Sequence, residues 1–311
     1  MSNAILDNSR ISKHLGQTSQ YKSTYDAGLL VREPRSNNRQ HINIQDDDLP
    51  FVGYDTWNAY EVSGLTENGL PISAVAKVVY NCNSKYIVES KSIKLYFNSF
   101  NMFNCGRNSG EALRFIEDTA TADLSELLET DVKVYLLQSH MIDRITNNKS
   151  CEVFTEQYST LENQYQVNEQ TFEYYSELPD LLQVTPRATS LREDYSMKVH
   201  SGLLKSNCRV TSQPDWGDVY IHMEGSGNTP CLNSLLKYIV SFRDECHFHE
   251  EICETIYVRL RDRYTPDKLA VTCLYARRGG IDINPCRASD TSLLPVNLID
   301  ATIPHIKTAK Q

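Results

Sequence analysis

The first half of the chain alternates apolar and polar positions in a way that predicts β-strands around one helix. Residues 57–80 predict two strands separated by a turn at 67–69 (Glu-Asn-Gly), which is typical of a β-hairpin. Strand patterns follow at 87–100 and 131–138, and the helix lies between them, beginning near Ser109. Its apolar residues recur at helical spacing and are Leu113, Ile116, Ala120, Leu124 and Leu127.

The second half repeats this order of elements. Strand patterns at 198–211 and 218–225 precede two helices, and two more strands follow at 268–277 and 279–285. The first helix covers about 231–242, and the second has an apolar face made of Phe248, Ile252, Ile256 and Leu260. Strands, helices and strands in each half predict an α+β fold with antiparallel sheets.

Composition divides the chain into four parts. Residues 1–50 are polar and rich in turn signals, which predicts an extended, partly wrapped arm before a first domain at 51–140. Residues 141–190 are rich in Glu, Gln, Asn, Thr and Tyr and poor in aliphatic residues, so they are expected to connect this domain to a second one at 191–311. A length of 311 residues is enough for two domains that each bury a core.

Charge and hydropathy exclude several classes of protein. The formal net charge is −9, and because phosphate binding needs clustered Lys and Arg, a general nucleic-acid binder is disfavoured. No stretch approaches the roughly 18 apolar residues of a membrane-spanning helix, and the N-terminus lacks the apolar core of a signal peptide. We therefore expect a soluble, cytoplasmic protein that does not bind a membrane.

The cysteines point to the same compartment. Their number is nine, their spacing is irregular, and no signal peptide leads to an oxidising compartment, so reduced thiols are expected. Several lie in apolar strand or helix patterns and are expected to fill the core, which leaves one or two for chemistry. The cysteines are Cys82, Cys105, Cys151, Cys208, Cys231, Cys246, Cys253, Cys273 and Cys286.

One segment combines a thiol with a carboxylate. In LKSNCRVTSQPDWG (204–217), Cys208 and Asp215 flank a turn that contains proline and glycine. A catalytic cysteine needs a partner that favours its thiolate, and Asp215 could transfer the proton if the loop folds back. The alternative is a buried strand cysteine followed by an ordinary turn.

A second segment, CHFHEEIC (246–253), is rich in possible metal ligands. His249 and Cys253 are neighbours on a helix, but there is no CxxC pair and no second ligand cluster, so a zinc site is disfavoured. Two alternatives remain open. His249 and Glu250 could face a pocket from the start of a helix, or the segment could be a solvated helix end.

Two further segments place positive charge beside serines and glycines. Lys91 lies in VESKSIKLY (88–96), and Arg277 and Arg278 lie in YARRGGIDINP (275–285). Glycine amides and basic side chains are what phosphate groups need. There is no Walker-type loop and no GxGxxG after a strand, so neither ordinary nucleotide fold is supported. Ordinary charged strands and a turn are the alternative.

Together these segments carry a resemblance to one family. ESKSIKLYFNSFN, LLKSNCRVTSQPDWG, SFRDECHFHEEICE and RRGGIDINP, in that order, resemble the NADPH-dependent 7-cyano-7-deazaguanine reductases, the nitrile reductases of queuosine biosynthesis. The segment LPFVGYDTWNAYE, near the start of the chain, is similar to the long form of that family. The resemblance implies two tandem tunnelling-fold (T-fold) domains in a homodimer. It also implies reduction of a free 7-deazaguanine nitrile to a primary amine by two NADPH, without direct contact with nucleic acid.

The resemblance also assigns roles to residues. Cys208 matches the nucleophile that forms a covalent thioimide with the nitrile, and Asp215 matches the residue that delivers protons. The residues that match substrate-binding positions are Val88, Glu89, Ser90, His249 and Glu250. Those that match NADPH-contacting positions are Ser90, Lys91, Arg278 and Gly279. Three positions depart from the family pattern: Arg209 replaces an aliphatic residue after the nucleophile, Cys286 stands where tryptophan is common, and Gln17 stands where lysine is frequent.

Three alternatives share parts of this pattern. Related proteins transfer nitrogen to the same nitrile on modified RNA but lack the ESKS segment, which is intact here at residues 89–92. A non-catalytic purine- or pterin-binding module would not need both Cys208 and Asp215. Zinc-dependent T-fold enzymes of pterin chemistry would need a ligand set that the sequence lacks.

Overall fold

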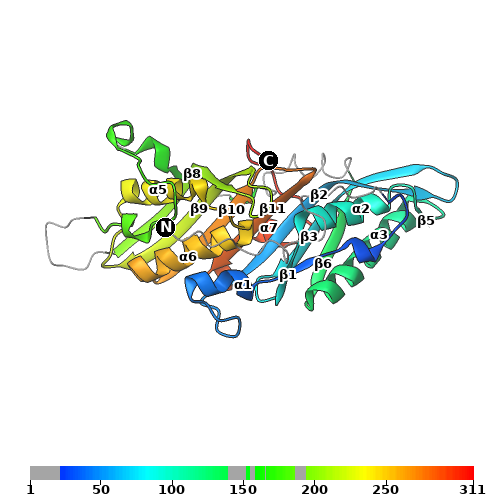
Figure 1. Cartoon of the computed structure of the whole chain (residues 1–311), viewed down its shortest axis with the longest axis horizontal. Helices are drawn as coiled ribbons and strands as arrows, with labels where there is room; N and C mark the ends of the chain where they lie inside the picture. Colours follow the sequence, from blue (N-terminus) through cyan, green and yellow to red (C-terminus); the bar gives the residue numbers. More distant parts are fainter. Residues whose placement is uncertain (1–21, 139–151, 155–157, 165, 186–193) are drawn as a thin grey trace.

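The computed structural model describes residues 22–138, 152–154, 158–164, 166–185 and 194–311. The strands of its main sheet are β2 (Val52–Thr66), β3 (Pro71–Asn81), β5 (Asn104–Gly106), β6 (Val132–Leu137), β7 (Ser159–Thr160), β8 (Asp194–Asn207), β9 (Pro214–Ser226), β10 (Lys268–Tyr275) and β11 (Ile281–Ala288). They form one sheet in the order β6-β3-β2-β11-β10-β9-β8-β7, with β5 beside β2 (Figure 1). All pairs are antiparallel except those of β5 and β7.

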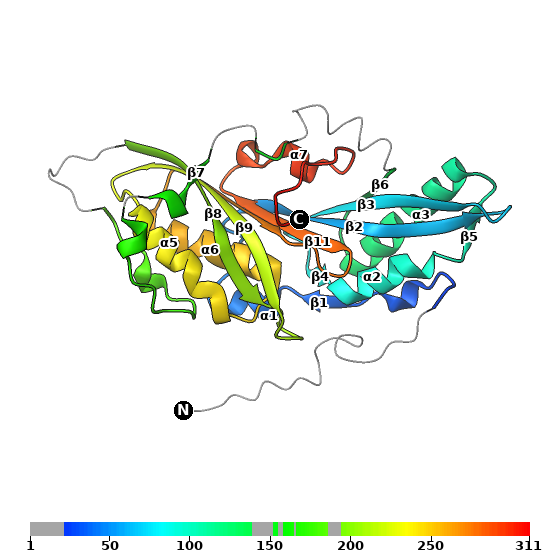
Figure 2. The same ribbon diagram turned by 90° about the horizontal axis from the view of Figure 1, so that it is seen from above.

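Helices cover this sheet on both faces. They are α1 (Ser36–Arg39), α2 (Ser90–Ser99), α3 (Ser109–Leu128), α5 (Leu232–Val240), α6 (His249–Tyr264) and α7 (Val296–Ile299). Seen from above, α5, α6 and α2 lie on one face and α7 on the other (Figure 2). Along β10, Val271 and Cys273 join the core under α6, whereas Ala270 and Leu274 join the core under α7. The predicted α+β class with antiparallel pairing is confirmed. None of the helices in the described residues is long and apolar enough to cross a bilayer.

The two halves share one sheet instead of forming the separate sheets that the sequence suggested. Strands β2 and β11 pair across the middle, with Trp57 opposite Ile283 and Ala59 opposite Ile281. Without this pairing, both strands would present unpaired backbone N–H and C=O groups at an edge. The pairing joins residues more than two hundred positions apart, so no local pattern could indicate it. We call this line of pairing the seam.

The prediction of a strand over 87–100 is wrong. Only β4 (Tyr86–Val88) is extended, and α2 follows it at once. The reason is a helix cap at Glu89, whose carboxylate accepts hydrogen bonds from the backbone N–H of Lys91 (2.9 Å) and Ser92 (2.8 Å). The apolar residues recur every three or four positions and are buried; they are Ile93, Tyr96, Phe97 and Phe100.

Most other predicted elements are confirmed. The hairpin of β2 and β3 turns at Gly69, which has a φ of 81°, and α3 begins at Ser109 after the Asn108 cap. The strand predicted over 198–211 lies earlier in the chain, because β8 begins at Asp194 and ends at Asn207. Cys208 therefore lies in a loop and not in a buried strand.

The arm and the connection are described only in part. Within the predicted arm (1–50), residues 1–21 lie outside the described residues, and the remainder includes α1 and β1 (Arg32–Pro34), which pairs with β4. Within the predicted connection (141–190), β7 adds a short parallel edge strand to β8. The arm is thus part of the folded body and contributes buried residues.

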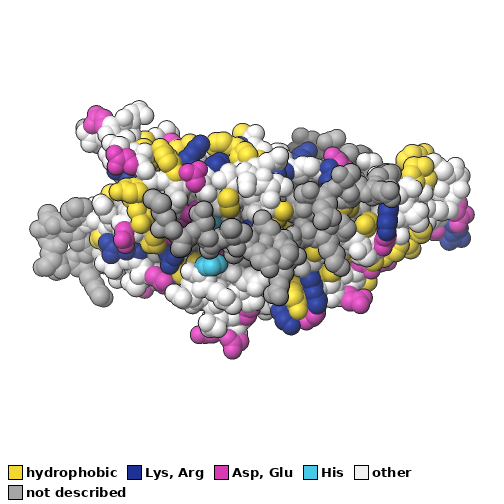
Figure 3. Space-filling view, viewed as in Figure 1, with side chains coloured by type: hydrophobic (Ala, Val, Ile, Leu, Met, Phe, Trp, Pro, Cys, Tyr) yellow, Lys and Arg dark blue, Asp and Glu magenta, His cyan; other side chains and the backbone are white. Residues whose placement is uncertain are grey.

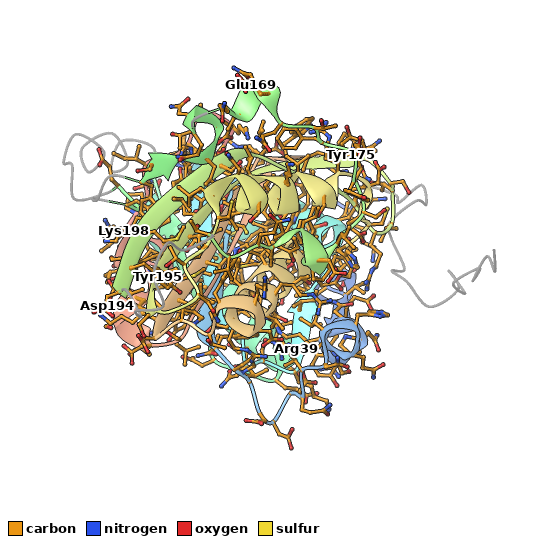
Figure 4. The ribbon with its side chains drawn as sticks, turned by 90° about the vertical axis from the view of Figure 1, so that its left-hand side faces the viewer. Arg39, Glu169, Tyr175, Asp194, Tyr195 and Lys198 are labelled. Atoms are coloured by element: carbon orange, nitrogen blue, oxygen red, sulfur yellow. The ribbon has the colours of Figure 1, made fainter. Side chains whose placement is uncertain are left out.

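A buried group of charges ties the arm to both halves. We call it the arginine cluster: Arg35, Arg39, Asp55, Glu254 and Arg287, none more than 3% exposed. Arg39 and Arg287 donate to Glu254 at 2.8 Å, and Arg287 also donates to Asp55 at 2.8 Å. Arg39 lies on α1 beside α6 (Figure 4). Each buried charge is matched by hydrogen bonds, which is the condition for burying charges without a large penalty.

Candidate active site

A cavity of about 190 Å³ lies at the seam, between the two halves. The first half contributes the start of α2, and the second half contributes the loop after β8, the start of α6 and the turn between β10 and β11. The lining residues are Trp57, Val88, Ser90, Lys91, Lys94, Cys208, Asp215, His247, Phe248, His249, Glu250, Ala276, Arg278, Gly279, Ile281 and Ile283. The cavity therefore collects every residue to which the family resemblance assigned a role, except Glu89.

Cys208 and Asp215 line the same cavity because β8 and β9 form a hairpin. Asp215 lies on β9 opposite Ser206 of β8, and Cys208 follows two residues later in the connecting loop. The loop closes through hydrogen bonds from the N–H of Cys208 to the carbonyl of Gln213 (2.8 Å) and from the N–H of Ser212 to the carbonyl of Cys208 (2.9 Å). The loop does fold back, and Cys208 is a half-buried free thiol.

Asp215 is 3% exposed and is held between two basic partners. The Nε2 of His249 lies 3.5 Å from Oδ2, and the guanidinium of Arg278 donates to Oδ1. Burial alone would raise the pKa of Asp215, but the hydrogen bonds and charges of His249 and Arg278 outweigh it and lower the pKa below its usual value. Asp215 is therefore poised as a carboxylate that can accept a proton.

The start of α6 supplies a buried carboxylate. Glu250 is 3% exposed, and its Oε1 has no hydrogen-bond partner among the described residues. Burial, and then the charge of Asp55, raises the pKa of Glu250 to about 8, although Arg35 opposes this. Next to it, the ring of His249 packs on Tyr275 with centroids 4.0 Å apart. A buried oxygen without a partner is costly, and donors on a bound molecule would satisfy it.

Glu89 lies beside the cavity but does not line it. Both of its carboxylate oxygens accept backbone N–H groups at the start of α2, and the side chain is 1% exposed. Its neighbours Val88 and Ser90 do line the cavity. In this structure Glu89 shapes the helix that presents Ser90 and Lys91.

Basic side chains form part of the lining, and we call Lys91, Lys94 and Arg278 the basic wall. Lys91, Lys94 and Arg278 line the cavity beside Gly279, whose φ of 55° is the left-handed conformation that glycine adopts readily. Arg277 instead stacks on the ring of Tyr60, 3.4 Å from its centroid, and does not line the cavity. On the described part of the face in Figure 3, Lys and Arg are interspersed with Asp and Glu, so this basic wall is a local feature.

The possible zinc ligands do not come together. Cys253 is buried and its thiol points to the carbonyls of Val271 and Pro285, each 3.6 Å away, whereas His249 faces Asp215. In the part of the chain that the structure describes, no three His, Cys, Asp or Glu side chains form a group that could hold a metal ion.

Several lining residues had no signal in the sequence. Trp57, Ile281 and Ile283 have the pattern of core strand residues, and they reach the cavity only because β2 and β11 pair. Phe248 fits the apolar face of α6 but lies at its N-cap, where it borders the cavity. An apolar residue at the first position of a helix next to a predicted site is the signal that could have identified it.

The departure at Arg209 has a structural role. Its guanidinium lies 3.0 Å from the Oε1 of Glu251 and 5.3 Å from the centroid of the Phe248 ring, so it ties the Cys208 loop to the start of α6. Of the other two departures, Cys286 is 1% exposed and packs in the core under α7, and Gln17 lies outside the described residues.

Two family models match parts of this chain. Residues 21–136 match the family model "Nitrile reductase, 7-cyano-7-deazaguanine-reductase N-term", and residues 214–292 match that of the "QueF-like protein". Over 32% of its length, the chain also aligns with the solved structure of the archaeosine synthase QueF-Like in the apo form, with 16% identity and a TM-score of 0.28. That similarity is too low to bear on the fold.

Curated relatives match almost the whole chain. The NADPH-dependent 7-cyano-7-deazaguanine reductase of Colwellia psychrerythraea is 38% identical over 90% of this chain and 93% of its own length. The enzyme of the same name from Acidovorax ebreus is 37% identical over 96% and 97%, and that from Legionella pneumophila is 36% identical over 92% and 93%. The chain therefore belongs to the family of NADPH-dependent 7-cyano-7-deazaguanine reductases.

Proposed function

We propose that this protein reduces the nitrile of 7-cyano-7-deazaguanine to the aminomethyl group with NADPH, as a step of queuosine biosynthesis. Family membership supports the reaction and the reductant. The observation that carries the proposal is the convergence of the Cys208 thiol and the Asp215 carboxylate with the buried Glu250 in one cavity. A nucleophile, a proton carrier and a ligand for the base are thereby within one small space.

The first step is covalent. Asp215 takes the proton of the Cys208 thiol, and the thiolate adds to the nitrile carbon as one carbon–nitrogen π bond breaks. The same proton passes from Asp215 to the nitrogen, which gives a neutral thioimide with no change in electron count. The thioimide accepts hydride more readily than the nitrile does, because its C=N carbon is more electrophilic.

Recognition of the base rests on carboxylates. A guanine-like edge presents a ring N–H and an exocyclic amine, and one carboxylate can accept both. Glu250, with its unpartnered Oε1, is the group best placed for this task, and His249 supports it beside Asp215. Glu89 can take part only by giving up a hydrogen bond to the start of α2, so Val88 and Ser90 are the nearer contacts on that wall.

The basic wall fits NADPH. Lys91 and Arg278 offer positive charge to the phosphates of the cofactor, and Ser90 offers a hydroxyl group. Gly279 leaves space that a side chain would fill, since a Cβ there would lie 3.3 Å from the Nζ of Lys94. When bound, two NADPH in succession supply the four electrons of the reduction. Between these steps Asp215 supplies protons to the nitrogen, and Cys208 leaves as a thiolate.

The remaining features of the proposal concern architecture. Each half runs strands, two helices and strands, which supports two tandem T-fold domains at 51–140 and 191–311, with an arm at 1–50 and a connection at 141–190. The proposal also holds that the protein is a homodimer, that its substrate is a free base without direct contact to nucleic acid, and that it is located in the cytoplasm. Analytical ultracentrifugation of the full chain tests the dimer, since a monomer at micromolar concentration would exclude it.

The reaction is tested by mixing protein, 7-cyano-7-deazaguanine and NADPH and following the absorbance of the reduced nicotinamide. Wild-type protein is expected to consume two NADPH per nitrile, and Cys208→Ala none. Cys246→Ala is the matched control, because Cys246 is an exposed thiol outside the cavity. Folded, reduced wild-type protein that consumes no NADPH in the presence of the nitrile would exclude the reductase.

The covalent step has its own test. Intact-mass analysis without NADPH should detect an adduct in wild type and in Cys246→Ala but not in Cys208→Ala. Asp215→Asn keeps the size of the side chain and loses its proton affinity, so turnover should fall by about 10²–10⁴-fold while the base still binds. Full turnover in Asp215→Asn would exclude Asp215 as the proton carrier.

A further inference from the structure

The turn between β10 and β11 directs the side chain of Arg278 toward the loop after β8, which contains Cys208. Arg278 and Ile281 exchange backbone hydrogen bonds of 2.8 and 3.0 Å across the turn, and Gly279 and Gly280 between them have φ values of 55° and 80°. Two positive φ values in a two-residue connection are typical of a tight hairpin turn that requires glycine. The backbone at Arg278 is therefore held firmly, and its side chain crosses to the loop that follows β8.

The side-chain hydrogen bonds of Arg278 are with that loop and with Asp215. Its guanidinium donates to Asp215 Oδ1, to Gln213 Oε1 (3.1 Å) and to Thr211 Oγ1 (3.4 Å), and Arg278 lines the same cavity as the Cys208 thiol. The side chain is 37% exposed, so it reaches this position from the edge of the cavity.

The charges agree with this geometry. Burial would lower the pKa of Arg278, but the hydrogen bond and charge of Asp215, followed by those of Cys208, raise it above its usual value. The same ion pair, with His249, lowers the pKa of Asp215. A fixed positive charge at this place keeps Asp215 ionised, and it lies in the same cavity as the Cys208 sulfur, where negative charge develops during the reaction.

We propose that Arg278 is a catalytic residue of the covalent step, in which it stabilises the Cys208 thiolate and holds Asp215 as the carboxylate that receives the thiol proton. This inference rests on the proposed function and adds to it a role that precedes any contact with NADPH. The proton moves from Sγ to Asp215, the S–C bond forms as the nitrile π bond breaks, and the nitrogen takes the proton. Arg278 keeps its own proton throughout and supplies only charge and hydrogen bonds.

The test measures adduct formation without NADPH, so that loss of cofactor binding cannot mimic the result. The variants are Arg278→Met and Arg278→Gln, and Arg277→Met is the matched control, because Arg277 is adjacent, carries the same charge and stacks on Tyr60 outside the cavity. Intact-mass spectrometry follows the rate of the adduct with 7-cyano-7-deazaguanine. Circular dichroism and the melting temperature verify that each variant is folded.

Both Arg278 variants are expected to form the adduct about 10²–10³-fold more slowly than wild type, which is the usual effect of removing one charge-stabilising donor. Arg277→Met is expected to match wild type. Without substrate, the pH at which Cys208 is half-alkylated by iodoacetamide should rise in Arg278→Met and stay unchanged in Arg277→Met. A change of fold alone would not produce that shift.

The outcomes separate this inference from the proposed function. Wild-type protein that forms no adduct would refute the covalent mechanism itself. Wild-type protein that forms the adduct, with Arg278→Met or Arg278→Gln reacting at the same rate, would leave the mechanism standing and overturn the role of Arg278. An equal slowing in Arg277→Met would also overturn it, because the effect would then follow from net charge and not from the position of Arg278.

Discussion

Replacing Glu254 by glutamine should destabilise the protein far more than any exposed charge does. Glu254 lies in the arginine cluster, is 3% exposed and accepts hydrogen bonds from Arg39 and Arg287 at 2.8 Å. The cluster holds three guanidiniums and two carboxylates, so it already carries one surplus positive charge. Glu254→Gln keeps the shape of the side chain and leaves three buried arginines with one carboxylate.

The magnitude follows from the burial of the carboxylate. Burial raises the pKa of Glu254, but Arg287 and Arg39 outweigh it and lower the pKa from 4.5 to about 2. A depression of this size corresponds to about 3 kcal/mol of stability, and removing one partner of a buried charge group typically costs about 3–5 kcal/mol. Because the folded pKa is the lower one, this stability is present above the unfolded value of 4.5 and is lost as the pH falls through about 2.

Urea unfolding followed by circular dichroism measures the loss, and Asp46→Asn is the matched control. Asp46 also contacts Arg39 at 2.8 Å, but its side chain is 36% exposed, so its removal should cost less than about 1 kcal/mol. Glu254→Gln should lose about 3–5 kcal/mol at about pH 7, and its difference from wild type should shrink in acid. Equal losses in the two variants would refute the argument that burial decides the strength of these pairs.

Three further predictions concern stability. His247 is half-buried, which lowers its pKa, but Glu245 and Glu251 raise the pKa from 6.5 to about 9. His247→Gln should therefore cost about 1–2 kcal/mol in urea unfolding below the unfolded pKa of 6.5 and nothing above about pH 9, and a cost independent of pH would contradict this. Asn108→Ala should remove about 1 kcal/mol, because Asn108 Oδ1 caps α3, and an unchanged melting temperature would contradict the cap. Gly53→Ala should lose about 1–3 kcal/mol, since its Cβ would lie 2.1 Å from the carbonyl oxygen of Cys286. Gly110→Ala, at an exposed position of α3, should instead raise the melting temperature. A loss of stability in both variants would contradict a steric cause.

Much of the fold was predictable because it depends on local spacing. The helix at α3 follows from apolar residues three and four positions apart and from a capping residue before Ser109, and the β2–β3 hairpin follows from alternation around Gly69. The prediction failed over 87–100 because its short alternating pattern also fits a helix. What decides for α2 is the side chain of Glu89, which binds the first backbone N–H groups.

The sequence indicated only part of the candidate site. The residue types in the Cys208 loop, at the start of α6 and in the β10–β11 turn indicate chemistry by themselves, and the structure brings them to one cavity. Trp57, Ile281 and Ile283 could not be recognised, because they resemble any buried strand residues. Nor could the sequence indicate that Glu89 would be occupied as a helix cap or that Arg277 would turn away from its neighbour Arg278.

The sequence by itself therefore determined the elements, the kinds of reactive group and the family, since each depends on residues close together in the chain. Only the tertiary structure decided how the halves join, because β2 and β11 pair across more than two hundred residues and no local preference selects that partner. The seam in turn decides which groups share a cavity. The contact of Arg278 with Asp215 also depends on tertiary structure, since the pairing of β9 with β10 holds the two hairpins of the second half side by side.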